Sequence, residues 1–365
     1  HKPPMATELS ITFFGGEPLL GYELIKNVKA YCRSAYPNIK WIYDLTTNFS
    51  IMNQTIYEEV ILDPNFYVLI SLDGREQDNI HRVFRNSGEP TYGTVIHNIK
   101  NIMLNPMFNQ EARDPTRARL DHWHGKETKE KFGIRATFSK KDIGTLFDRF
   151  KWLHQNFGIR FVLMQVDDES WDDVDFDLYS SQMRQIIAYI EEKQTKELYP
   201  CIKFFNDAMV SFRNLFLGYP NSQQKSCGQA IGQFAVDYTG KIAPCHRLTN
   251  INLMREDSPF LIGTLDTGLD EKAILRIRNL ESEVENQCVA RDCKNRGACA
   301  FGCFGAGAST HVKEDNLFVC NGGNDGLHNF HEFNYRIISD LFFCEEVIPF
   351  FRNTLNIHTE VKVNF

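Results

Sequence analysis

The sequence lacks the features that mark several common protein classes. Its 365 residues contain no run of about 18 apolar residues, so we expect no membrane-spanning helix. The first residues, HKPPMATELS, have neither the charged nor the apolar region of a secretory signal. Acidic residues outnumber basic ones, 47 to 40, so the charge balance does not favour nucleic acid as a partner. Neither G-x-G-x-x-G nor G-x4-G-K-S/T occurs, which argues against a phosphate-binding loop.

Cysteine, in contrast, is abundant and concentrated towards the C-terminus. Seven of the ten cysteines lie between residues 227 and 320. They comprise a first pair with Gly240 five residues before its second member, a run with the spacing C-x4-C-x5-C-x3-C, and a last cysteine: Cys227 and Cys245, then Cys288, Cys293, Cys299 and Cys303, then Cys320. Because no secretion signal accompanies them, this abundance favours a reducing, cytoplasmic location.

Three kinds of chemistry account for cysteine at this density: disulfides, zinc sites and iron–sulfur clusters. Disulfide scaffolds are typical of short secreted chains that cannot build a core, whereas this chain has 42% hydrophobic residues. Zinc takes four ligands, and seven cysteines do not divide into such sites unless His246 completes one. Seven thiolates suit one complete iron–sulfur cluster and a second with an open iron. Spacing favours the clusters without excluding zinc or disulfides.

Apolar runs alternate with helical patterns through the first 200 residues. Strands are predicted at 9–14, 41–47, 66–72, 132–139 and 159–166. The predicted helices are 18–36, 91–104, 143–155 and 176–196, together with a stretch after Asn48 that ends at residue 60. Such alternation predicts an α/β fold with parallel strands and crossover helices, either an open sheet or a barrel. The polar segment 105–131 interrupts the rhythm and is predicted to be a surface insertion.

Polar residues recur where the predicted strands end, which is where parallel α/β folds bind ligands. The positions are the run Gly15, Gly16, Glu17 and Pro18, the pair Thr47 and Asn48, Ser71 with the following Asp73 and Gly74, and Arg135 within its strand. Adjacent glycines let the backbone approach a ligand closely. The Glu17 carboxylate is suited to accept hydrogen bonds from a ligand's ammonium group.

These residues resemble the motifs of one family. FFGGEPLL looks like the motif by which radical SAM enzymes hold the amino group of S-adenosylmethionine (SAM, AdoMet). ISLDG, followed by HRVFRN and GEPTYGTVIHNIKNI, is similar to a stretch of the radical SAM peptide-modifying enzymes, and the cysteine pattern resembles their SPASM or twitch-type extension. The resemblance covers nearly the whole chain. It implies a partial (β/α)6 radical SAM barrel followed by a SPASM domain with two auxiliary four-iron–four-sulfur (4Fe-4S) clusters.

When the functional residues of the family are carried over to matching positions, the resemblance assigns cluster ligands and SAM contacts in this sequence. The first auxiliary cluster would take Cys227, Cys245 and Cys303, which leaves one iron open, and the second would take Cys288, Cys293, Cys299 and Cys320. The SAM methionine moiety would lie against Gly15, Gly16, Glu17 and Pro18, with Ser71, Arg135, Thr47 and Asn48 as further contacts to its carboxylate and ribose.

The sequence departs from the family pattern in three places. No C-x3-C-x2-C precedes the GGEP motif, so we expect that the first strand and the catalytic cluster loop are absent, and that this chain alone does not cleave SAM. Cys288 and Cys293 are separated by four residues where the family usually has two. His246 stands where sulfatase-maturing members place an acidic base, which argues against formylglycine formation. His246 is the candidate catalytic base, and an orienting or packing role for it stays open.

The resemblance implies a maturase of a ribosomally made peptide, which would use a 5′-deoxyadenosyl radical to form a thioether or another cross-link. The implied partners are a precursor peptide and an electron donor such as a flavodoxin or ferredoxin, and the catalytic cluster would belong to the intact parent enzyme. The expected domains are the barrel (1–198), a linker (199–226), the SPASM domain (227–325) and a helical extension (326–365). Two alternatives stay open: a non-catalytic iron–sulfur or zinc protein that binds peptides, and a SPASM enzyme that acts on a small molecule.

Overall fold

The computed structural model describes residues 7–103, 119–121, 126–128, 132–158, 160–165, 172–194 and 229–279. The chain divides into two compact units. The first unit comprises His1–Gln165 and Ser181–Asn206, and the second comprises Val166–Ser180 and Asp207–Phe365. The predicted linker at 199–226 and the predicted extension at 326–365 lie outside the described residues.

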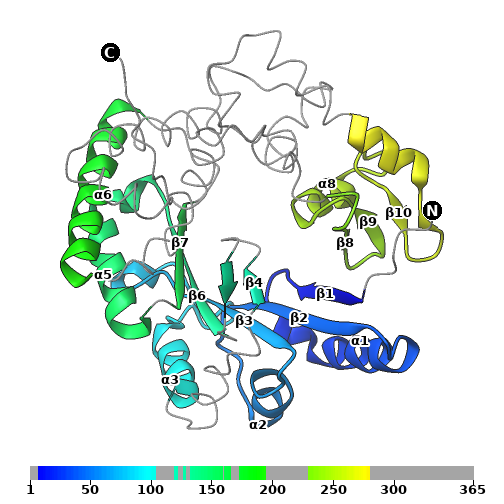
Figure 1. Ribbon diagram of the computed structural model, residues 1–365, viewed down its shortest axis with the longest axis horizontal. Helices are drawn as coiled ribbons and strands as arrows, with labels where there is room; N and C mark the ends of the chain where they lie inside the picture. The colour runs from blue at the N-terminus through cyan, green and yellow to red at the C-terminus, as the bar shows by residue number, and fades with distance from the viewer. Residues whose placement is uncertain are drawn as a thin grey trace, which may run out of the picture. The chain divides into compact units, whose positions relative to one another are not determined.

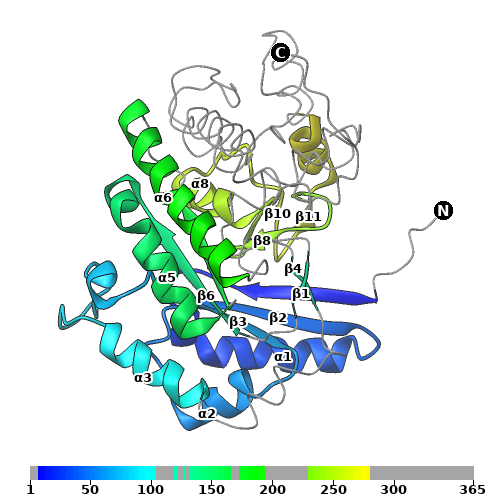
Figure 2. The same ribbon diagram turned by 60° about the vertical axis from the view of Figure 1, so that its left-hand side comes forward.

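The first unit is built on a five-stranded sheet with the order β1-β2-β3-β6-β7, in which every neighbouring pair is parallel. Its strands are β1 (Glu8–Phe13), β2 (Lys40–Thr47), β3 (Phe66–Ser71), β6 (Phe132–Phe138) and β7 (Phe161–Gln165). Each strand therefore lies beside its predecessor in this sheet. Helices α1, α3 and α5 all cover the same face, as both ribbon views show (Figures 1 and 2).

The helices follow the strands in the predicted rhythm. They are α1 (Tyr22–Ala35), α2 (Gln54–Ile56) with a π-helical turn (Tyr57–Ile61), α3 (Tyr92–Met103), α5 (Leu146–Phe157) and α6 (Asp173–Lys193). Short 3₁₀ turns precede α1 (Pro18–Gly21) and α5 (Lys140–Thr145) and follow β3 (Glu76–Asn79). The α/β alternation and the parallel sheet are thus confirmed, with strand bounds within two residues of the prediction.

The segment between α3 and β6 contains structure that the sequence did not predict. Strands β4 (Arg119–Asp121) and β5 (Lys126–Thr128) pair antiparallel as a hairpin of their own. The polar composition of 105–131 was interpreted only as a surface insertion, because three-residue strands are too short to show an alternating pattern. The rest of this insertion lies outside the described residues.

The two faces of β3 differ in burial. Phe66, Val68 and Ile70 are buried, while the alternate positions are half-buried. Lys29 of α1 shows which face meets this helix, because its Nζ lies 4.7 Å from the centre of the Phe66 ring. Since side chains alternate along a strand, Ser71 belongs to the opposite face, together with its register partner Arg135. We call this the Ser71 face.

A buried ion pair fixes α1 against the sheet. Lys29 Nζ lies 2.7 Å from Asp63 Oδ2 and donates to the Glu59 carbonyl at 2.9 Å. Arg33 adds a second contact to Asp63 at 3.2 Å. Breaking such a pair by removing one partner is costly, because the other charge stays buried and uncompensated. The pair therefore anchors α1 to the start of β3.

The described part of the second unit contains a small antiparallel sheet with the order β11-β10-β9-β8. Its elements are β8 (Ala235–Val236), β9 (Lys241–Ala243), α8 (Thr249–Met254), β10 (Gly263–Thr264) and β11 (Gly268–Leu269), followed by a helical stretch at 271–279. Ile242, Leu248, Phe260, Ile262 and Ile277 form its apolar cluster, together with the Cys245 side chain. In the described part of the chain, no helix has the length and apolarity needed to cross a bilayer.

We predict that Ile70→Ala lowers the free energy of unfolding by about 2–5 kcal/mol, because Ile70 is fully buried on the helix-facing side of the central strand. Ile80→Ala is the matched control, since Ile80 is 75% exposed and its truncation should cost less than about 0.5 kcal/mol. Urea denaturation of both variants measures the difference. Equal losses would contradict the assignment of this face as the core.

Candidate functional site

The ends of four neighbouring strands form one edge of the sheet. The register pairs Phe13 with Leu45, Thr47 with Ile70, and Ser71 with Arg135. Parallel strands point their carboxyl ends in the same direction, so the segments that follow β1, β2 and β3 leave the sheet side by side. We call this the carboxyl edge, and it holds all eight residues that the resemblance assigned to SAM.

The two glycines after β1 leave their backbone uncovered. Gly15 has φ = +145°, a conformation that side-chain-bearing residues rarely adopt. A Cβ placed on Gly15 or Gly16 would meet no atom within 4 Å. The strained conformation explains the requirement for glycine at position 15. The open space explains how another molecule can approach the loop.

The Glu17 carboxylate joins this loop to the end of β2. Its Oε1 accepts hydrogen bonds from Leu19 N at 3.0 Å and Thr47 Oγ1 at 2.7 Å. Its Oε2 accepts one from Asn48 N at 2.7 Å. Pro18 follows at the first position of the 3₁₀ turn, where the missing N–H costs nothing. The sequence predicted that the Glu17 carboxylate accepts hydrogen bonds from a ligand. In the structure, three donors of the chain itself occupy most of the acceptor capacity of this carboxylate.

The turn after β2 is held by several hydrogen bonds in a strained conformation. Phe49 is buried and has φ = +58°. Its N–H donates to Thr47 Oγ1 at 2.9 Å, and its carbonyl accepts from Asn98 Nδ2 of α3 at 2.9 Å. Asn48 Oδ1 accepts from the backbone and the hydroxyl of Ser50. A strained residue persists only where its surroundings hold it in place. Phe49 is held by Thr47 at the end of β2 and by Asn98 of α3.

Ser71 and Arg135 face each other across the β3–β6 ladder. They are register partners, and both are half-buried on the Ser71 face. Arg135 Nε lies 3.1 Å from Met164 Sδ of β7. A hydroxyl beside a guanidinium offers both a donor and a charge to a carboxylate. The register places the two residues opposite each other, and their assignment to AdoMet stays a prediction.

A buried carboxylate that the sequence analysis gave no role lies one step further along this edge. Asp73 is fully buried, and its Oδ1 accepts from the backbone N–H and the hydroxyl of Thr137, both at 2.8 Å. Its Oδ2 is 2.7 Å from Arg82 Nε and 3.1 Å from His81 Nε2. The Asp-Gly pair after β3 was noted only as a strand-end signal. Its partners lie 64 positions away in Thr137 and nine in Arg82, a relation that no local pattern contains.

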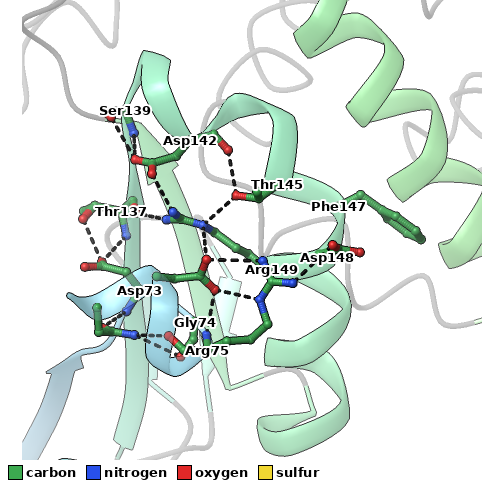
Figure 3. A network of polar contacts seen from close by, with 12 residues as sticks. Asp73, Gly74, Arg75, Thr137, Ser139, Asp142, Thr145, Phe147, Asp148 and Arg149 are labelled. Atoms are coloured by element: carbon green, nitrogen blue, oxygen red, sulfur yellow. Dashed lines mark hydrogen bonds and ion pairs between the residues drawn. The ribbon is translucent and has the colours of Figure 1, made fainter.

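A second ion-pair group supports the same region (Figure 3). Arg149 of α5 contacts Asp78 Oδ1 at 3.1 Å and Asp142 Oδ1 at 2.6 Å. Burial acts to raise the pKa of Asp142, but hydrogen bonds from Ser139 and the charge of Arg149 outweigh it and hold that pKa below its ordinary value. Gly74 leaves room for this group, because a Cβ there would lie 2.7 Å from Asp78 Oδ2.

The remaining candidates belong to the second unit. Cys245 is 5% exposed and directly precedes the 3₁₀ turn that runs from His246 to Leu248. His246 is exposed. The other six assigned cysteines lie outside the described residues: Cys227, Cys288, Cys293, Cys299, Cys303 and Cys320. Their assignment as cluster ligands stays a prediction.

Comparisons with known proteins place the chain by its fold. No protein-family model matches it. A stretch of 88 residues is 36% identical to an uncharacterised protein of Methanocaldococcus jannaschii, and the match covers 24% of this chain and 30% of that protein. The chain therefore spans less than a third of that relative.

Solved structures match over a much longer range. Native anSMEcpe with bound AdoMet aligns with a TM-score of 0.64 over 97% of this chain and 86% of that chain, at 17% identity. Native anSMEcpe with bound AdoMet and the Kp18Cys peptide aligns with a TM-score of 0.63, over 96% and 86%, at 16% identity. The chain shares this fold.

We predict that Glu17→Gln destabilises the first unit by about 1–3 kcal/mol. The new amide group would present a donor where the carboxylate accepts from Thr47 or Asn48, which leaves a donor unsatisfied. Glu23→Gln is the control, because the Glu23 side chain is 75% exposed. Thermal unfolding followed by circular dichroism measures both. An unchanged melting temperature for Glu17→Gln would contradict the structural role of this carboxylate.

Proposed function

We propose that this protein is a radical SAM peptide maturase: a partial (β/α)6 barrel that binds AdoMet, followed by a SPASM domain with two auxiliary 4Fe-4S clusters. Its substrate would be a ribosomally made precursor peptide, modified in the cytoplasm with electrons from a flavodoxin or ferredoxin. The 5′-deoxyadenosyl radical that removes a hydrogen atom from the peptide would require the catalytic 4Fe-4S cluster of the intact parent enzyme, because the printed residues contain no C-x3-C-x2-C motif. The protein supplies position, orientation and the exclusion of water.

The observation that carries the proposal is the convergence of separate sequence signals on one edge. The GGEP loop, Thr47 with Asn48, and Ser71 come from three strand ends, and the register places Arg135 of β6 beside Ser71. Ligands in parallel α/β folds bind at this edge. The fold is shared with anSMEcpe, which has been solved with AdoMet bound.

The residues of the carboxyl edge suit AdoMet chemically. Its amino acid moiety carries an ammonium and a carboxylate. The uncovered backbone at Gly15 and Gly16 leaves space for the ammonium end, with carbonyl groups as acceptors. Arg135 and Ser71 offer a charged and a neutral donor for the carboxylate or the ribose. Glu17 would act by holding the loop in place, since most of its acceptor capacity serves Leu19, Thr47 and Asn48.

For the clusters, the described part of the chain offers one assigned thiol. Cys245 lies at the end of β9, where the apolar cluster of the second unit surrounds it. Within the described residues no three His, Cys, Asp or Glu side chains gather into a metal site, so the proposal for the other six ligands depends on their spacing.

We predict that the purified chain binds AdoMet and that Arg135→Ala weakens this affinity about tenfold, the value of one charge-assisted hydrogen bond. The matched control is Arg33→Ala, since Arg33 lies on α1 and its exposed side chain contacts Asp63. Isothermal titration calorimetry under anaerobic conditions gives both dissociation constants. The printed residues contain no C-x3-C-x2-C motif, so the test measures binding and not turnover. Absence of AdoMet binding in the unaltered chain would reject the proposed function.

We also predict about eight irons and eight acid-labile sulfides per chain after anaerobic reconstitution, from two 4Fe-4S clusters. Cys245→Ala should reduce both counts to about four, because one cluster loses a ligand. Cys32→Ala is the control. Burial raises the pKa of the Cys32 thiol, which disfavours the thiolate that metals need, and Cys32 lies in α1. Zinc in place of iron, or equal iron in the two variants, would reject the cluster assignment.

A further inference from the structure

Asp73 lies directly beyond the residues assigned to AdoMet. It follows Ser71 by two positions, and its partner Thr137 follows Arg135 by two. The ladder between β3 and β6 continues past Ser71, because Leu72 N donates to the Arg135 carbonyl at 3.1 Å. Beyond this bond the Asp73 carboxylate takes the place of a backbone acceptor, because Thr137 N donates to Asp73 Oδ1.

The carboxylate of Asp73 connects three parts of the edge. Oδ1 binds the Thr137 backbone and hydroxyl, which belong to β6. Oδ2 binds the guanidinium of Arg82, which belongs to the segment after β3. The backbone N–H of Asp73 donates to Asn79 Oδ1 at 2.9 Å. A fully buried carboxylate with this many donors sets the spacing of the groups around it, because each donor would otherwise be left unsatisfied.

A guanidinium and an imidazole contact the same oxygen. Arg82 keeps 24% of its side chain exposed and His81 62%, and both contact Asp73 Oδ2. Loss of the negative charge would leave Arg82 beside a neutral group. The segment from 79 to 82 and the end of β6 would then lose their common anchor.

We infer that Asp73 is a positioning residue of the proposed AdoMet site: it locks the carboxyl ends of β3 and β6 so that Ser71 and Arg135 present their donors at a fixed separation. This inference rests on the proposed function. Asp73 itself acts through its neighbours, since its carboxylate is fully buried and saturated with donors from the chain. A small displacement of positioned groups is enough to weaken a ligand site strongly.

The test compares two buried carboxylates of the same first unit. Asp73→Asn and Asp63→Asn each remove a charge that is ion-paired and nearly or fully buried. Asp63 pairs with Lys29 on the helix side of the sheet, so its loss should lower stability without altering the carboxyl edge. Calorimetry with AdoMet is carried out at a temperature at which circular dichroism shows both variants folded.

We predict that Asp73→Asn raises the AdoMet dissociation constant about tenfold, whereas Asp63→Asn changes it less than about threefold, as expected for a distant site. Equal dissociation constants in the two variants would overturn the inference and leave the proposed function standing. No binding by the unaltered chain would reject the proposed function, and the positioning role with it.

A second pair of variants keeps the test valid if Asp73→Asn does not fold. Thr137→Val removes the hydroxyl that donates to Asp73 Oδ1 and keeps the shape, while Thr137→Ser keeps the hydroxyl. Weaker AdoMet binding by Thr137→Val and normal binding by Thr137→Ser support the inference. Equal affinity in these two variants contradicts it.

Discussion

Two carboxylates hold the carboxyl edge of the sheet together, and the proposed site depends on both. Glu17 joins the segment after β1 to the end of β2 through Thr47 and Asn48. Asp73 joins the segment after β3 to β6 through Thr137. Strand ends have no ladder beyond them, so their polar groups need such partners. A negative charge that accepts several hydrogen bonds fixes a loop more firmly than neutral contacts do.

This arrangement separates the carboxylates that hold the strand ends from the groups that are proposed to contact the ligand. The carboxylate oxygens of Glu17 and Asp73 accept hydrogen bonds from the chain itself. The uncovered backbone at Gly15 and the Ser71–Arg135 pair lie on the edge that these carboxylates hold. Rigid support beneath a few available polar groups is what a precise binding site requires. The buried group around Arg149 extends the support into α5.

The sequence predicted the sheet well because its physical signals are local. Buried β-rich runs such as FYVLIS, with Gly, Pro or Asp after them, define a strand and its end within a few residues. That the residues after these strands lie along one edge of the sheet follows from parallel pairing alone. The bonds from Glu17 to Thr47 and from Asp73 to Thr137 could not be predicted, because these partners lie 30 and 64 positions apart. The β4–β5 hairpin was missed because its strands are three residues long.

The measurement that tests the central claim most directly is a crystal structure of the chain grown with AdoMet. The account predicts ligand density at the carboxyl edge, with the amino acid moiety beside Gly15 and Gly16 and the ribose or carboxylate within hydrogen-bonding distance of Ser71 or Arg135. The bonds from Glu17 to Thr47 and from Asp73 to Thr137 should remain intact. Density at another place on the chain, or an AdoMet that replaces the Thr47 bond to Glu17, would contradict the account.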